Sequence, residues 1–272
     1  TGHQEAVDVL LNTRDFSSIL NPDPLAPLRF EPEGDDITAQ VMAAQGTGPM
    51  DLMVSYDGDM HTAARHLLNP LFKPSRLKAN EAFMRDYAEG MVREMVGRGS
   101  CELISEVATP YVTMVIADLL GVPEDDREEF RRLIDSAPPP GNMEAADDGQ
   151  SVHPLMIMGG YFMRYISERR AQPQDDVMTE LAQAAYPDGT VPELIEVVKT
   201  AMFLFAAGQD TSAKLLGNSL RFLCESPDLQ QQLRDDRALI GPFLEECLRL
   251  EGSTKATFRL AQRKTRVGDM DI

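Results

Sequence analysis

The segment Ala206–Ser212 combines residue types that could admit a flat ligand and move protons. Gly208 has no side chain, so a planar ligand could approach the backbone closely there. Asp210 and Thr211 are an acid and an alcohol in succession, a pair that could relay protons inward from solvent. Thr211 could donate its hydroxyl to the carbonyl of Ala207 or turn its side chain into a cavity. A polar turn with a surface kink accounts for the same composition, and both interpretations stay open.

Two further pairs of residues lie at helical spacing. Glu246 and Arg249 are at i and i+3, where surface ion pairs are common and contribute little. His61 and Arg65 are at i and i+4, and two polar or cationic heads on one helix face can clamp a pair of carboxylates. Arg259, in an apolar β-like run, could bind an anionic group or point to water. In isolation, each pair is more typical of a solvated face than of a site.

Helices must position these residues, and almost every segment has helical periodicity. The longest predicted helix starts at Thr190–Glu193, which has capping-box spacing, and no proline follows until Pro227; about 34 residues would extend ~50 Å. Its middle, Ala201–Ala207, has no polar face and is expected to be buried all round. Glycine, aspartate and threonine inside such a helix are unfavourable, and their combination suggests a purpose.

The remaining segments are shorter. Thr109 is the predicted N-cap of a helix that should end at Gly121. Residues 137–150 have the composition of a loop, and β-like sequence occurs only at 257–260 and 265–267. Other helices are predicted over 5–11, 60–72, 79–96, 125–134, 155–169, 176–185 and 238–250.

Composition restricts the class of protein. The 272 residues carry a formal net charge of −18, which argues against a general nucleic-acid or anionic-membrane surface. No window approaches ~18 consecutive apolar residues, so no membrane span is expected. Three separate cysteines indicate free thiols in a reducing cytoplasm, and the four histidines lack zinc-type spacing. No secretion signal is visible, and the true start is expected upstream because the chain lacks an initiator Met.

In this order and spacing, the motifs resemble the cytochrome P450 superfamily, specifically its soluble bacterial members. The family's distal helix carries Ala-Gly-x-(Asp/Glu)-Thr, which residues 207–211 match, and its Glu-x-x-Arg motif is matched by residues 246–249. Its His-Thr-x-x-Arg…Phe-x-Pro segment is matched by His61, Thr62, Arg65, Phe72 and Pro74. Smaller similarities are at residues 116–123, 168–173 and 226–227. Each motif is weak alone, but five in order over essentially the whole chain are strong.

The resemblance implies a mainly α protein with the P450 fold and a minor sheet. It implies a single, partial domain over residues 1–272, incomplete at both ends. Haem b would lie against the long helix, and other residues would bind its propionates or form a buried Glu-Arg-Arg network. The implied site residues are Ala207, Gly208 and Thr211 against the haem, His61, Arg65 and Arg259 at the propionates, Asp210 and Thr211 in proton delivery, and Glu246 and Arg249 in the network.

The sequence also departs from the family pattern. The family's thiolate ligand lies in a Phe-x-x-Gly-x-x-x-Cys-x-Gly loop, which this chain lacks. None of its cysteines (Cys101, Cys224 and Cys247) matches that position, so the axial cysteine is expected beyond Ile272 and no metal ligand within the chain. After Glu251 the family usually has Ser-Pro, whereas this chain has Gly252-Ser253. The chain is therefore interpreted as a fragment of a longer enzyme.

The implied activity is a monooxygenase that inserts one oxygen atom of O2 into a C–H bond of a hydrophobic small organic molecule. A peroxide-using relative is disfavoured because Asp210 and Thr211 retain the oxygen-activating pair. A non-catalytic helical binding or regulatory protein is the alternative, favoured by the missing ligand loop. Segments 40–56, 137–150 and 254–256 match regions that shape the family's pocket, with an adaptable apolar lining from Met42, Met50, Leu52 and Met53.

The resemblance also implies partners. Electrons would come from a soluble ferredoxin or flavodoxin-type system, and the protein is expected to be a cytoplasmic monomer. A single helix bearing four basic residues is predicted to supply the docking charge: Arg65, Lys73, Arg76 and Lys78.

Overall fold

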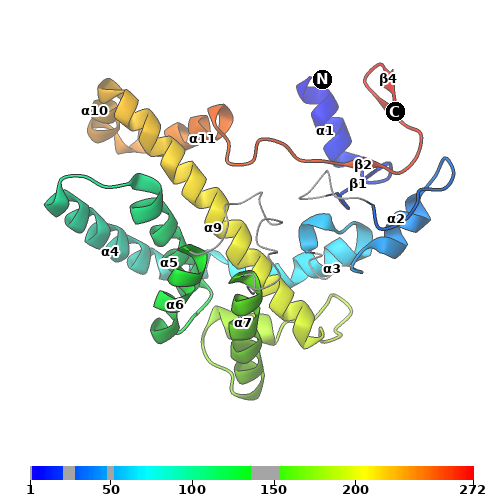
Figure 1. The fold of residues 1–272 in the computed structure, drawn as a ribbon, viewed down its shortest axis with the longest axis horizontal. Helices are drawn as coiled ribbons and strands as arrows, with labels where there is room; N and C mark the ends of the chain where they lie inside the picture. Colours follow the sequence, from blue (N-terminus) through cyan, green and yellow to red (C-terminus); the bar gives the residue numbers. More distant parts are fainter. Residues whose placement is uncertain (1, 21–27, 48–51, 136–153) are drawn as a thin grey trace. The chain divides into compact units, whose positions relative to one another are not determined.

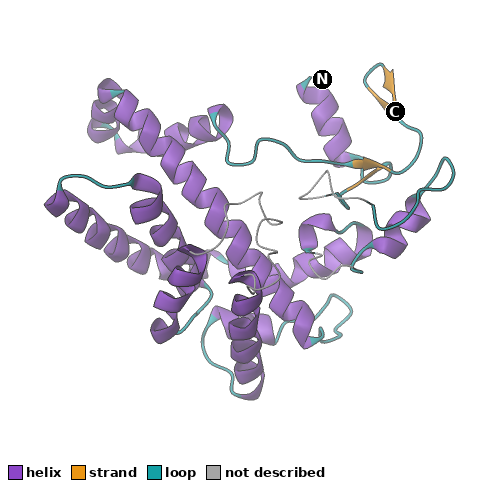
Figure 2. Cartoon of the chain, in the orientation of Figure 1, coloured by secondary structure: helices purple, strands orange, loops and turns teal. Residues whose placement is uncertain are grey.

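The computed structural model describes residues 2–20, 28–47, 52–135 and 154–272, and most of them are helical (Figure 2). This confirms the mainly α class, and the predicted loop at 137–150 lies outside the described residues. The elements in chain order are α1 His3–Leu11, β1 Phe16–Ser17, α2 Thr38–Ala44, the 3-10 helix η1 Met53–Ser55, α3 Gly58–Leu68, the 3-10 helix η2 Asn69–Phe72, α4 Pro74–Arg98, the π-helix η3 Ile104–Ala108, α5 Thr109–Leu119, α6 Glu124–Asp135, α7 Pro154–Ala171, α8 Val177–Ala182, α9 Leu194–Glu225, α10 Pro227–Asp235, the 3-10 helix η5 Arg237–Leu239, α11 Ile240–Leu250, β2 Leu260–Ala261, β3 Arg266–Val267 and β4 Met270–Asp271.

The chain forms two compact units. Unit 1 comprises Thr1–Leu68, Ala185–Val191 and Ala256–Ile272. Unit 2 comprises Asn69–Ala184 and Pro192–Lys255. Each unit has its own core, and the single domain expected over residues 1–272 stays a prediction.

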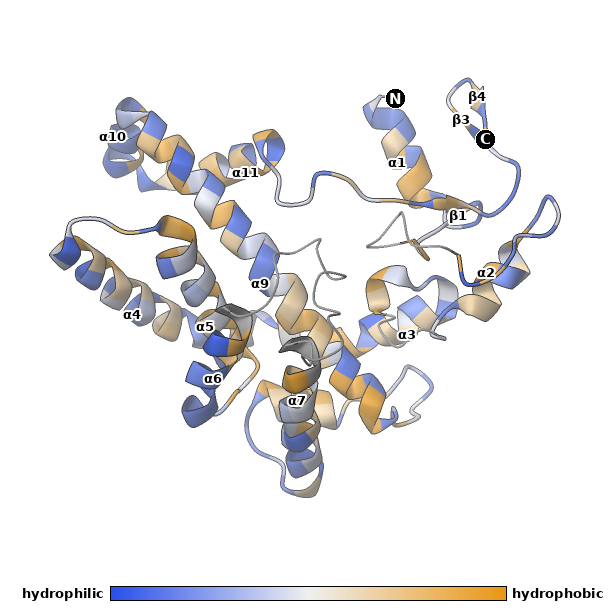
Figure 3. Cartoon of the chain, in the orientation of Figure 1, coloured by the Kyte–Doolittle hydropathy of each residue, from blue (hydrophilic) through white to orange (hydrophobic). Residues whose placement is uncertain are grey.

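The core of unit 2 is built on α9, which packs against α5 and α7 (Figure 1). Phe130 of α6, Phe162 of α7 and Phe205 of α9 are each 0% exposed. Their ring centroids lie 5.5 to 6.2 Å apart in edge-on contacts, the geometry that aromatic quadrupoles favour. The rest of α6 is mostly hydrophilic (Figure 3), so Phe130 and the buried Leu133 anchor a helix that is otherwise mostly charged.

Helix α5 ends as predicted but starts differently. Gly121 has a φ of +74°, the left-handed conformation that terminates helices and that glycine adopts without strain. At the other end, the N-cap predicted at Thr109 is wrong. Ala108 before it is already helical, with φ −65° and ψ −51°, because the π-helix η3 continues directly into α5. Pro110 is tolerated there because it lies in the first turn of the α-helical segment.

A half-buried carboxylate joins α4, α5 and α6. Asp118 accepts a hydrogen bond from Arg127 Nη2 at 2.8 Å and from Asn80 Nδ2 at 2.6 Å. The same guanidinium donates to the Val122 carbonyl at 3.0 Å and lies over the ring of Phe83. Charge-assisted bonds of this kind are stronger than neutral ones, so Asp118 holds three helices in one arrangement.

We expect Asp118→Ala to destabilise the protein by about 2 kcal/mol, because Arg127 and the buried Asn80 would lose their shared acceptor. Urea unfolding followed by circular dichroism measures the change. Asp118→Asn keeps one acceptor and should lose less, and the exposed Asp125→Ala should stay within about 0.5 kcal/mol of the parent. Equal stability of the Asp118→Ala and Asp125→Ala variants would contradict the assignment.

A buried pair fixes the connection from α7 to α8. Arg169 Nε donates to Asp176 Oδ2 at 2.7 Å, and the two side chains are 9% and 18% exposed. The other carboxylate oxygen of Asp176 accepts the Thr179 amide at 2.7 Å and so caps α8. The next residue, Arg170, donates to the carbonyls of Ala182 and Pro192. The segment at residues 168–173 is therefore structural.

Helix α9 spans 32 residues but starts later than predicted. The capping box at Thr190–Glu193 is wrong, because Thr190 bonds to Asp188 through both its amide and its hydroxyl. Glu193 is the N-cap and makes no side-chain capping bond, and Leu194 is the first helical residue. The hydroxyl that was expected to cap the helix is thus used in a local turn.

Unit 1 brings segments from both ends of the chain together. Strand β1 pairs antiparallel with β2, with Phe16 opposite Ala261, and β3 pairs antiparallel with β4. These strands are shorter than the runs predicted at 257–260 and 265–267. Helix α3 is anchored at its start by Asp57, whose carboxylate accepts hydrogen bonds from Ser17 Oγ, the Ser18 amide and Gln45 Nε2.

Candidate functional site

The motif in α9 forms a continuous helical turn. Thr211 Oγ1 donates to the Ala207 carbonyl at 2.9 Å, which is the back-bond that the sequence allowed. Asp210 Oδ2 accepts from Lys214 Nζ at 2.7 Å, one turn further along the helix. Ala207 and Thr211 are exposed in unit 2, whereas Gly208 and Asp210 are half-buried. The turn therefore presents a methyl group and an alcohol side by side on an open face.

The complete burial predicted for the middle of α9 is wrong. Ala201 and Phe205 are 0% exposed, but the three residues between them are half-buried and Ala207 is exposed. Among the described residues, the side of α9 that carries Ala207 is therefore the less covered one. That side is where the predicted haem-contacting residues begin.

The absence of a side chain at Gly208 also serves the packing of two helices, in addition to the predicted approach of a flat ligand. A Cβ atom built on Gly208 would lie 2.5 Å from Cδ1 of Ile116 on α5, closer than real atoms approach. The glycine therefore allows α5 to pack tightly against α9. Its predicted contact with a flat ligand stays a prediction.

A residue that the motifs missed fastens this turn from outside the helix. Ser253 Oγ donates to the Thr211 carbonyl at 2.7 Å, across 42 residues of sequence. The only signal in the sequence was the departure Gly252-Ser253 from the family's Ser-Pro, and it did not indicate a contact. Ser253 lies three residues beyond the end of α11.

Glu246 and Arg249 pair on α11 as their spacing predicts. Arg249 Nε and Nη2 donate to the two carboxylate oxygens of Glu246 at 2.7 and 2.6 Å. The hydrogen bond from Arg249 lowers the pKa of Glu246, and the carboxylate raises the pKa of Arg249. In the described residues the side chains are 52% and 66% exposed, so the buried Glu-Arg-Arg network stays a prediction.

The predicted propionate ligands belong to unit 1. His61 and Arg65 lie one turn apart on α3, and both are exposed. Arg259 is half-buried and directly precedes β2, and its Nη1 donates to Thr257 Oγ1 at 3.0 Å and to the Phe258 carbonyl at 2.7 Å. These bonds are local and leave the remaining guanidinium nitrogens for an anion.

The prediction that one helix carries the four basic docking residues is wrong. Arg65 lies on α3 of unit 1, whereas Lys73 is the N-cap of α4 and Lys78 lies within α4 of unit 2. Lys73 also pairs with Glu180 at 3.4 Å. The side chain of Arg76 lies outside the described part of the chain.

The residues of segment 40–56 that were predicted to line an apolar pocket differ in their exposure. Met53 is buried and Leu52 half-buried, whereas Met42 is 46% exposed. Met50 lies outside the described residues. None of the helices described combines the length and the apolar run that crossing a membrane requires.

The three cysteines are free, as expected. Cys247 is buried in α11, and Cys101 is half-buried between α4 and η3. Cys224 lies 13 residues after Thr211 on the same helix, about 20 Å along its axis, so the two cannot face one iron atom. Among residues 2–20, 28–47, 52–135 and 154–272, no three His, Cys, Asp or Glu side chains gather where a metal ion could bind.

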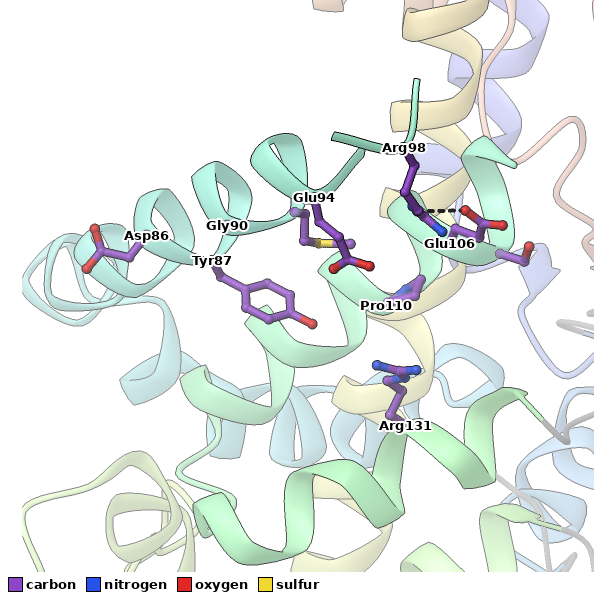
Figure 4. Close-up of a pocket in the computed structure, with 10 residues that line it drawn as sticks. Asp86, Tyr87, Gly90, Glu94, Arg98, Glu106, Pro110 and Arg131 are labelled. Atoms are coloured by element: carbon purple, nitrogen blue, oxygen red, sulfur yellow. Dashed lines mark ion pairs between the residues drawn. The ribbon is translucent and has the colours of Figure 1, made fainter. Parts of the chain in front are cut away.

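A cleft of about 390 Å³ opens between α4, η3, α5 and α6 (Figure 4). Tyr87, Glu94 and Arg131 line it, and an Arg98–Glu106 ion pair at 2.8 Å closes one side. Burial raises the pKa of Tyr87. None of the predicted site residues contributes to this cleft.

The fold and the order of these sites have clear counterparts in known proteins. The structure matches that of the substrate-free cytochrome P450 CYP150A6 of Mycobacterium marinum with a TM-score of 0.89 and 46% sequence identity, over 100% of this chain and 63% of that one. The chain belongs to the cytochrome P450 superfamily. No protein-family model matches the chain. The P450 fold expected from the motifs is confirmed.

Curated P450s are also similar in sequence. The biotin biosynthesis cytochrome P450 of Bacillus subtilis is 30% identical over 276 residues, which cover 100% of this chain and 64% of that protein. The vitamin D(3) 25-hydroxylase of Pseudonocardia autotrophica is 30% identical over 207 residues, which cover 75% and 49%. The chain thus spans between about half and two thirds of the length of these P450s.

P450s are haem proteins, and the described residues fit that group. Haem is a flat ring with two carboxylates. In unit 1, the exposed heads of His61 and Arg65 make no hydrogen bond or ion pair with other described residues, so they can receive carboxylates. In unit 2, the exposed Ala207 offers only a methyl group to a ring face. That the axial thiolate comes from a cysteine beyond Ile272, and not from the three cysteines of this chain, stays a prediction.

Proposed function

We propose that this P450 is a haem b monooxygenase that inserts one atom of O2 into a C–H bond of a hydrophobic small molecule. The observation that carries the proposal is the exposed Thr211 directly after Asp210 on α9, in a chain of P450 fold. The vitamin D(3) 25-hydroxylase among its relatives supports hydroxylation of an apolar substrate.

The chain's residues would divide the work as follows. His61, Arg65 and Arg259 would bind the propionates by charge-assisted hydrogen bonds and so fix the ring. Haem, when bound, supplies the oxygen activation and the C–H chemistry.

Proton delivery would fall to α9. The Thr211 hydroxyl donates its own hydrogen to the Ala207 carbonyl, which turns the lone pairs of Oγ1 outward to accept a proton or a water molecule. Asp210 would take up a proton at Oδ1, since its Oδ2 is held by Lys214. Lys214 keeps the carboxylate pointing along the helix between turnovers.

The partners follow from the same proposal. Electrons would come from a soluble ferredoxin or flavodoxin-type system, and we infer a cytoplasmic monomer. A non-catalytic binding or regulatory protein was the alternative, and the named relatives, a hydroxylase and a biosynthetic P450, do not support it.

The test is the absorption spectrum of the dithionite-reduced, carbon monoxide-bound full-length protein. We expect a red-shifted Soret band, because a thiolate ligand donates electron density to the iron. A protein that binds haem without this shift would not be a haem-thiolate enzyme. A preparation with no haem absorbance after haem supplementation would overturn the proposal.

A further inference from the structure

Thr211 is held at two atoms, and only one of the two bonds lies within its own helix. Its hydroxyl donates to Ala207 of α9, while its carbonyl accepts from Ser253 Oγ at 2.7 Å. The second bond is additional to the helical ladder. Because it comes from the segment after α11, the position of that segment bears directly on this turn of α9.

The segment after α11 is shaped so that Ser253 can reach α9. A Cβ atom at Gly252 would lie 2.9 Å from the Leu248 carbonyl oxygen, a backbone atom that cannot move aside cheaply. Only glycine therefore lets the chain pass so close to the last turn of α11. The family usually has Ser-Pro where this chain has Gly252-Ser253. Here the glycine permits the tight turn, and the turn brings the serine hydroxyl to α9.

Two further contacts fasten the same segment to α9. Asn218 Nδ2 donates to the Glu251 carbonyl at 2.8 Å, and Arg221 lies 3.8 Å from the Glu251 carboxylate. Positions 211 and 218 are seven residues apart, so they lie on one face of α9, about 10 Å apart along the helix axis. The segment 251–253 is therefore attached to α9 over two turns, and the bond at Thr211 is one end of that attachment.

The attached turn has a weak intrinsic preference for helix. Gly208 and Thr211 are both poor helix formers, with glycine the worse of the two. Hydrogen bonds to carbonyls from outside a helix tilt those carbonyls outward, and the direction of the nearby side chain follows. A donor fixed at the Thr211 carbonyl therefore restrains the direction in which Oγ1 of the same residue points.

We propose that Ser253 is a positioning residue for proton delivery: its hydroxyl holds the backbone at Thr211 so that the Thr211 alcohol keeps its place. The inference rests on the proposed function, because it assigns to Ser253 an effect on a reaction that Thr211 serves. Ser253 does not touch the reacting atoms in this role. It acts only through Thr211, and this distinguishes it from a second proton donor.

The experiment measures the partition of electrons between product and hydrogen peroxide in the haem-loaded protein with its redox partners. We expect Ser253→Ala to raise the peroxide-to-product ratio by about two- to tenfold, the effect of one hydrogen bond. Ser253→Thr keeps the hydroxyl and should restore the parent ratio. Gly252→Ala should raise the ratio by a second route, since it displaces the segment without removing the hydroxyl.

Ser219→Ala is the matched control. Ser219 Oγ donates to the Leu215 carbonyl at 2.7 Å, so this variant removes a serine-to-carbonyl bond of equal length from the same helix. It should leave the ratio unchanged. If Ser219→Ala and Ser253→Ala raise the ratio equally, Ser253 only stabilises the helix, and the proposal is overturned.

The double variant separates positioning from an independent role. In a Thr211→Ala background, Ser253→Ala should add nothing to the ratio, because the residue through which it acts is gone. Additive effects would overturn the proposal, as would an unchanged ratio in the single Ser253→Ala variant. Both outcomes presuppose turnover by the parent protein. Failure of the proposed function would instead show as a parent protein without the thiolate spectrum or reductant-driven oxygen use.

Discussion

Thr211→Ala is expected to divert electrons from hydroxylated product to hydrogen peroxide and to lower product formed per electron by about tenfold or more. The substitution removes the only alcohol in the turn Ala207–Thr211 and with it the atom proposed to pass protons inward. Oxygen activation would then proceed without a correctly placed donor, and reduced oxygen would escape. Simultaneous measurement of reductant consumption, peroxide and product gives the partition directly.

Two variants make this result specific. Thr211→Ser keeps a hydroxyl within reach of the Ala207 carbonyl and should retain most of the coupling. Thr200→Ala removes an equivalent bond, since Thr200 Oγ1 donates to the Glu196 carbonyl at 2.8 Å, eleven residues earlier on α9. It should couple like the parent. Unchanged coupling in Thr211→Ala would remove Thr211 from proton delivery.

Asp176→Ala is expected to lower the free energy of unfolding by about 3 kcal/mol, the largest stability effect foreseen for a single polar side chain in unit 2. The substitution leaves the guanidinium of Arg169 buried without its carboxylate and removes the cap at the Thr179 amide. Both losses act on the connection between α7 and α8. Urea unfolding followed by far-ultraviolet circular dichroism measures the change.

An exposed ion pair provides the control for Asp176→Ala. Glu81 and Arg85 of α4 pair at 3.2 Å with side chains 62% and 66% exposed. Glu81→Ala should therefore change the free energy of unfolding by no more than about 0.5 kcal/mol. If the two variants lose similar stability, burial of the Arg169–Asp176 pair does not matter to the fold.

Signals within a few residues of each other predicted the helices well. Apolar periodicity located α4 and α7, although α4 begins at Pro74 and not at the predicted Ala79. Gly121 marked the end of α5 because few other residues adopt a positive φ. The site motif in α9 was likewise local, since Gly208, Asp210 and Thr211 lie within one turn.

Predictions failed where a local signal had two possible uses. Thr190 has capping-box spacing to Glu193, yet its hydroxyl bonds to Asp188 in a turn. Thr109-Pro110 is typical of a helix start, yet the preceding π-helix supplies the turn that an N-cap would have begun. In both places a neighbouring group, Asp188 or the π-helix η3, determined where the helix starts. The periodicity of apolar residues carries no information about such neighbours.

Long-range contacts at the site could not be predicted at all. The bond from Ser253 to Thr211 joins residues 42 positions apart, and nothing in either segment indicates the other. The tight approach of Ile116 to Gly208 similarly depends on how α5 crosses α9. Side-chain spacing along one helix indicates which residues share a face, but not which helix covers that face.

Because Gly208 and Ile116 are in contact, the residue at one of these positions restricts which residues the other can accept. A methyl group at 208 collides with the δ-methyl of Ile116, so Ile116 would have to rotate or be shortened before position 208 could change. The atom in the way is the end of a flexible side chain, so alanine at 208 requires either another rotamer of Ile116 or a smaller residue at 116. Libraries that randomise residues 116 and 208 together therefore sample pairs that a change at 208 alone reaches only if Ile116 changes its rotamer.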